Sequence, residues 1–102
     1  MFRGMTVEHM VWFRFREDVS AVRRDEHTKG LKGLLGVVPG IIRLEVGENF
    51  TERALGCTLG LIATLESKAA LDAYQVHPSH VAVAQGLRAD CDQILAFDFE
   101  HA

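Results

Sequence analysis

Residues 7–16 read VEHMVWFRFR and alternate in the period-two pattern of a β-strand, in which successive side chains point to opposite faces. One face is apolar except for a histidine and consists of Val7, His9, Val11, Phe13 and Phe15. The other face is mixed but carries two large side chains, Met10 and Trp12. A strand with two such faces predicts a sheet that packs against something on both sides.

The segment that follows predicts a helix over residues 20–38. Ser20 suits the N-cap, and Pro39 with Gly40 stops the helix. Three glycines recur at three-residue spacing within this helix, which either marks a close approach to the sheet or is simply tolerated. The apolar positions recur near helical spacing at Val22, Leu31, Leu34, Leu35 and Val38, and His27 falls near their face.

The rest of the chain predicts three more strands and a helix in two parts. Residues 41–46, 58–65 and 93–99 have strand character, and in the second of these Leu59 and Leu61 share one face. Ser67 can cap a short helix that runs through Gln75. Pro78 suits the first turn of another helix, which runs to about Asp90.

The resulting order, β-α-β-β-α-β, is the ferredoxin-like arrangement of the α+β class. We therefore predict an antiparallel four-stranded sheet with both helices on one face and the second helix broken at His77-Pro78. No linker or repeat divides the sequence. Residues 1–102 are predicted to form one domain, which runs from about Thr6 to Phe99 with short tails.

The sheet face opposite the helices needs a cover, because large apolar side chains are costly to leave in water. The simplest cover is a second copy of the sheet across a two-fold axis. We therefore predict a homodimer in which two sheets close into a shared barrel. The residues expected at this interface are Met10, Trp12, Ile62, Ile94 and Ala96.

Composition narrows the class of partner. The chain has 14 Asp plus Glu against 11 Lys plus Arg and a formal net charge of −3, with no clustered basic stretch, which argues against nucleic-acid binding. The apolar run of residues 34–42 is interrupted and far too short to span a bilayer. We expect a cytoplasmic protein that binds no membrane, with free thiols at Cys57 and Cys91.

Three histidines and a tyrosine fall where chemistry is possible. His9 lies on the apolar strand face, and Tyr74, His77 and His80 lie in the segment YQVHPSH of residues 74–80. Imidazole titrates near neutrality, and a helix N-terminus would keep His80 neutral and able to act as a base. The competing interpretation is that these side chains only complete the core. Because the turn before Pro78 separates His77 from His80 and no carboxylate joins them, we predict no metal site and no cofactor.

With these residues in place, the sequence resembles the stress-responsive A/B barrel family, also called dimeric α/β barrel domains. The likeness covers nearly the whole chain. Its most specific element is a first-strand histidine together with YxxHPxH, here His9 and residues 74–80. The other matching segments are VEHMVWFRFRED (7–18), VPGI (38–41), LEVGENF (44–50) and AFDFE (96–100).

The resemblance implies a ferredoxin-like monomer that dimerises through its sheet. A polyketide cyclase of this family works by aldol condensation without a cofactor. By analogy, His80 would be the base, Tyr74 would assist it, and His9 would line the pocket with Val11 and His77. Two polar pocket positions of that cyclase are matched here by Leu31 and Leu59, so a more apolar pocket is expected.

Three functions stay open at the level of sequence. The first is a homodimeric pocket protein that binds or converts a small apolar carbonyl or phenolic compound by general-base chemistry. The second is a non-enzymatic stress or assembly protein. The third is a cofactor-free monooxygenase, which rests on an analogy of fold alone.

Overall fold

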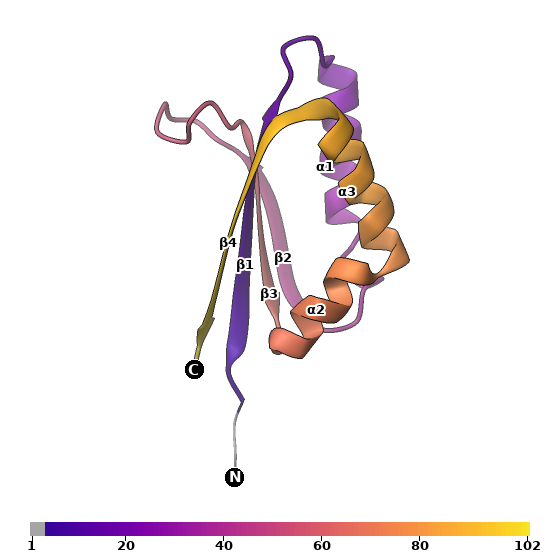
Figure 1. The fold of residues 1–102 in the computed structure, drawn as a ribbon, viewed down its shortest axis with the longest axis vertical. Helices are drawn as coiled ribbons and strands as arrows, with labels where there is room; N and C mark the ends of the chain where they lie inside the picture. The colour runs from indigo at the N-terminus through magenta and orange to yellow at the C-terminus, as the bar shows by residue number, and fades with distance from the viewer. Residues whose placement is uncertain (1–3) are drawn as a thin grey trace.

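The computed structural model describes residues 4–102, and its four strands form one antiparallel sheet in the order β2-β3-β1-β4. All helices lie on one side of this sheet (Figure 1). The elements are β1 (Thr6–Phe15), α1 (Ala21–Lys32), β2 (Ile41–Glu48), β3 (Leu59–Leu65), α2 (Lys68–Val76), α3 (Pro78–Asp90) and β4 (Cys91–His101). The predicted ferredoxin-like fold is confirmed, including the helix in two parts.

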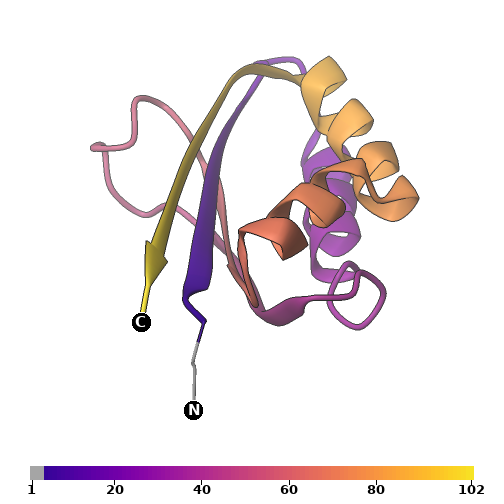
Figure 2. The same ribbon diagram turned by 60° about the horizontal axis from the view of Figure 1, so that its bottom comes forward.

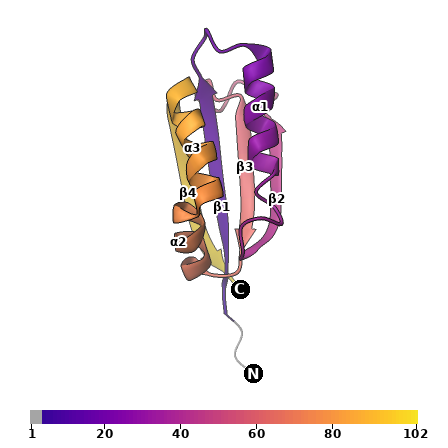
Figure 3. The ribbon, with the colours of Figure 1, turned by 90° about the vertical axis from the view of Figure 1, so that its right-hand side faces the viewer.

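The helices cover different strands of the sheet. Seen from the helix side, α1 lies in front of β3 and β2, whereas α2 and α3 lie in front of β1 and β4 (Figure 3). We call the face that they cover the inner face and the opposite one the outer face. The loop of residues 49–58, between β2 and β3, projects on the outer side (Figure 2). Within residues 4–102, no helix is long and apolar enough to cross a membrane.

The core lies between the inner face and the helices, and strand alternation fills it. Along β3, alternate side chains are buried, as the sequence predicts, and they lie beside the buried positions of β1. The helices and the turn after α1 supply the remainder. The buried apolar residues are Val7, Phe13, Phe15, Leu31, Leu34, Val38, Leu44, Leu59, Leu61, Ala63, Leu65, Tyr74, Leu87 and Cys91.

The first helix is shorter than predicted. It ends at Lys32 with Gly33 as its C-cap, and the chain then turns through Gly36, whose φ is +85°. Leu34 and Val38 are buried from this turn rather than from a helix, while Val22 is 72% exposed. The glycines that follow residue 32 therefore end the helix instead of bringing it close to the sheet.

The break between α2 and α3 falls where the sequence predicts it. Ser67 caps α2, since its hydroxyl accepts a hydrogen bond from the Ala70 N–H. At the break, His77 has an extended backbone, and its Nδ1 accepts from the Ser79 N–H at 3.1 Å. His77 is thus the N-cap of α3, and Pro78 occupies its first turn, where a missing N–H costs nothing.

The pairing of β4 with β1 corrects the predicted outer face. Ile94 pairs with Phe13 and Ala96 pairs with Val11, so both lie on the inner face, not beside Trp12. When a strand is apolar on both sides, its sequence does not show which side faces the helices. A shift of one residue in its pairing register then moves every side chain to the opposite face. The β4 side chains on the outer face are instead Leu95, Phe97 and Phe99.

Gly40 lies in the turn before β2, where the backbone tolerates no side chain. Its φ is +90°, and a Cβ there would come within 2.9 Å of the Cβ of Ala70. Gly40→Ala should lower the free energy of unfolding by about 1–3 kcal/mol, because it adds backbone strain to this clash. Urea denaturation measures the change. Gly47→Ala is the matched control, since Gly47 has nothing within 4 Å, and a Gly40 variant as stable as this control would contradict the turn geometry.

Candidate functional site

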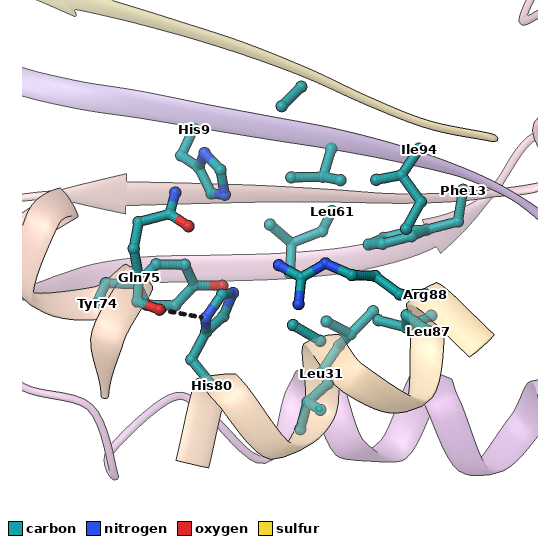
Figure 4. A pocket seen from close by; sticks show the side chains of 14 residues that line it. His9, Phe13, Leu31, Leu61, Tyr74, Gln75, His80, Leu87, Arg88 and Ile94 are labelled. Carbon is teal, nitrogen blue, oxygen red and sulfur yellow. Dashed lines mark hydrogen bonds between the residues drawn. The ribbon is translucent and has the colours of Figure 1, made fainter. Parts of the chain in front are cut away.

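A cavity of about 190 Å³ lies between the inner face of the sheet and helices α2 and α3 (Figure 4). Most of its wall is apolar. Its polar groups come from β1, from the last turns of α2 and from both ends of α3. The lining residues are His9, Val11, Phe13, Leu31, Leu61, Tyr74, Gln75, His80, Val83, Ala84, Leu87, Arg88, Ile94 and Ala96.

His9 reaches the cavity from β1 and is held by a carboxylate. Its side chain is buried, and its Nδ1 is hydrogen-bonded to a carboxylate oxygen of Asp98 on the paired strand β4. Because the carboxylate can only accept, Nδ1 of the ring carries a proton. In the neutral form of the ring, the other nitrogen, Nε2, is an acceptor. The ring is directed from β1 towards Tyr74 and His80 (Figure 4).

Tyr74 lies between the two histidines. Its side chain is 1% exposed. The centroid of its ring lies 5.5 Å from that of the His9 ring, which it meets edge-on, and 4.3 Å from that of the His80 ring. Burial raises the pKa of Tyr74 to about 12. The side chain is therefore a neutral phenol near pH 7 and can donate a hydrogen bond to an oxygen in the cavity.

His80 lies in the first turn of α3 and has a defined tautomer. Its Nδ1 donates a hydrogen bond to the backbone carbonyl of Gln75 at 3.2 Å, which leaves Nε2 with a free lone pair (Figure 4). Burial lowers the pKa of His80, although the hydrogen bond to Gln75 opposes this effect. The imidazole is thus neutral near pH 7, as a proton acceptor must be.

The other residues predicted to line a pocket divide into two groups. Val11 and Leu31 line the cavity. Leu59 is buried further along β3, and Leu61, which pairs with Val11, takes the place expected for it. His77 does not line the cavity, since its ring is engaged in capping α3. Over residues 4–102, no group of three or more His, Cys, Asp or Glu side chains is arranged to hold a metal ion.

Three groups at the site are absent from the sequence-based prediction. Asp98 fixes His9, Gln75 supplies both a backbone carbonyl and a side chain, and Arg88 brings a positive charge to the cavity. The signal for Asp98 is its alternation with Phe97 and Phe99, which puts a carboxylate on the same face as Ala96. That signal has meaning only once the β1–β4 register is known.

Comparison with known proteins assigns this chain to a family. The family model described as Stress responsive A/B Barrel Domain matches residues 7–101. Olivetolic acid cyclase of Cannabis sativa is 25% identical over 97 residues, which cover 93% of this chain and 96% of the relative. A stress-response A/B barrel domain-containing protein of Arabidopsis thaliana, HS1, is 28% identical over 96 residues, with 92% and 88% covered.

One solved structure is similar to this chain in both fold and sequence. It is a dimeric ferredoxin-like protein of unknown function from Jannaschia sp. CCS1, with a TM-score of 0.82 and 32% sequence identity. The match covers 94% of this chain and 99% of the other. Since the family model spans residues 7–101 and the fold agrees, the chain belongs to the stress-responsive A/B barrel family.

Proposed function

We propose that this protein binds a small apolar carbonyl or phenolic compound in the cavity and converts it by general-base chemistry without a cofactor. The observation that carries the proposal is the convergence of His9, Tyr74 and His80 on one largely apolar space. If these side chains only completed the core, two imidazoles and a phenol would not surround an unfilled space, since empty cavities in proteins are normally apolar.

The arrangement supports a proton abstraction next to a carbonyl group. Nε2 of His80 takes the proton from the carbon, and the electron pair moves into the carbonyl to form an enolate. The Tyr74 hydroxyl donates a hydrogen bond to the enolate oxygen, where negative charge develops. In an aldol-type closure, the enolate carbon attacks a second carbonyl of the same molecule, and the new alkoxide takes the proton back from His80. His9, fixed by Asp98, orients the substrate.

The family relationship supports the same class of reaction. One relative of this chain is named as a cyclase, and the match covers nearly all of both proteins. A ring closure through an enolate needs a base and a hydrogen-bond donor on one side of a dry cavity. His80 and Tyr74 meet that requirement here, with rings 4.3 Å apart.

Replacement of His80 tests the base. His80→Asn should reduce turnover of polyketide-like β-polycarbonyl compounds by about 10²-fold to 10⁴-fold, the usual contribution of a general base. His77→Asn is the matched control, because asparagine preserves an N-cap and His77 does not line the cavity. Activity is measured by product formation. If wild-type protein neither binds nor converts any carbonyl or phenolic compound tested, the enzymatic proposal is wrong.

The protonation state of the proposed base has its own test. The NMR titration of the His80 ring should give a pKa below the ordinary value of 6.5, because burial disfavours the imidazolium. Since the unfolded chain then binds a proton that folded His80 does not, the contribution of His80 to stability falls as the pH drops from about 6.5 through the folded pKa.

His101 serves as the internal reference for that titration. The hydrogen bond with Glu8 raises the pKa of His101, so the two rings should titrate on opposite sides of 6.5. The stabilisation from this pair is full below the unfolded pKa of histidine and is lost as the pH rises through the folded pKa. A His80 ring that titrates above pH 7 would exclude a neutral base at that pH.

We also propose that the protein is a homodimer through the outer face. This face exposes several large side chains, including Trp12 at 43% and Phe97 at 63%. Gly60 lies opposite Trp12 on β3 and leaves room for the indole above the sheet. The loop of residues 49–58 projects on the same side and carries Phe50, which is 96% exposed (Figure 1). The Jannaschia protein with this fold is dimeric, which supports the proposal.

The interface is tested with substitutions on the two faces. Trp12→Glu should convert the dimer to a monomer, because it places a charge at the centre of a surface that would be desolvated. Ile94→Gln is the control, since Ile94 lines the cavity and should leave the dimer intact. Analytical ultracentrifugation measures both. A Trp12 variant that sediments as wild type does, or an Ile94 variant that dissociates, would contradict this assignment of faces.

A further inference from the structure

The cavity holds one charged group that the proposed reaction does not use, the guanidinium of Arg88. His80, Ala84 and Arg88 are spaced at i, i+4 and i+8 on α3, so they share one face of that helix, and all three line the cavity. The side chain of Arg88 reaches from the C-terminal part of α3 along the cavity towards Tyr74 and His80 (Figure 4). The two residues thus begin two turns apart on α3, and the guanidinium extends back towards the proposed base.

Arg88 has no internal partner for its charge. Arg14 and Arg23 are paired with Asp92 and Asp90, both at 2.7 Å, whereas Arg16, Arg24 and Arg53 resemble Arg88 in having no carboxylate partner in the described part of the chain. Within residues 4–102, no carboxylate lies within ion-pair distance of Arg88. A guanidinium is always charged near pH 7 and is most strongly bound by a carboxylate or phosphate oxygen pair.

The cavity around this guanidinium contains no negative charge. None of its lining residues is Asp or Glu, and Asp98 lies outside the lining, where it is engaged by His9. Among the other polar groups of the lining, Tyr74 and the side-chain amide of Gln75 can donate hydrogen bonds, whereas His80 presents the lone pair of its Nε2. The walls between them are apolar, while Arg88 is itself an exposed residue whose charge is partly screened by water. The electrostatics of the cavity therefore favour an anionic ligand.

We propose that the ligand of this cavity is an organic acid with a small apolar body, whose carboxylate is bound by Arg88. This rests on the proposed function and narrows its substrate class from a neutral compound to an anion. The size of the cavity agrees, since an apolar cavity of about 150 Å³ admits benzene. At about 190 Å³, there is room for a single ring or a short alkyl chain with one substituent. Arg88 is then the residue that determines specificity.

Matched acids and amides test the charge separately from the shape. The probes are 4-ethylbenzoate with 4-ethylbenzamide, and hexanoate with hexanamide, measured by calorimetry on the full chain. Wild-type protein should bind each acid about 10-fold to 100-fold more tightly than its amide, as expected for hydrogen bonds to charged groups. Arg88→Gln should remove this preference, because it weakens acid binding much more than amide binding. Arg88→Lys should retain part of it, because lysine keeps the charge but not the planar fork.

Arg53→Gln is the control variant, since Arg53 is an exposed arginine of the 49–58 loop and does not line the cavity. It should preserve the preference for the acid. Equal binding of acid and amide by wild-type protein, or a preference that survives in Arg88→Gln, would overturn the role of Arg88 and leave the proposed cavity function intact. Failure of both probe pairs to bind would refute the cavity function itself, and the acid preference with it.

Discussion

Asp98 and His9 face each other across β1 and β4, and the hydrogen bond between them sets the chemistry of the cavity. A buried imidazole without a partner could rotate or change tautomer, and its nitrogens would have no fixed role. The carboxylate holds the proton on Nδ1 and presents Nε2 to the cavity. The same register that brings Asp98 to His9 also turns Phe97 and Phe99 outward. One pairing therefore creates both a polar site inside and an apolar surface outside.

The broken helix is the second requirement of the site. In a continuous helix, Tyr74 and His80 would be six residues apart and would point about 120° away from each other. The extended backbone at His77 interrupts the helix and lets both rings face the cavity, 4.3 Å apart. Pro78 makes the interruption permanent, because the residue before a proline is disfavoured in the helical region. The His77-Pro78 pair thus determines the position of His80.

Much of the fold follows from the sequence, because β1 and β3 alternate cleanly and because Pro78 and Ser67 mark helix boundaries. The end of α1 does not follow, since Leu34 and Val38 keep helical spacing while the backbone at Gly36 leaves the helix.

Of the candidate site, the sequence shows the histidines and the tyrosine, whose types carry the chemistry. It does not reveal Asp98 or Arg88. Their role depends on strand register and on which helix face meets the cavity, and local periodicity determines neither.

Burial is the main reason that the pKa of His80 is lowered, and the positive charge of Arg88 contributes to the same shift. A carboxylate bound to Arg88 would neutralise that contribution and raise the affinity of His80 for a proton. The acid that Arg88 selects would thereby strengthen the base that acts on it, so recognition and reactivity are coupled through one helix face.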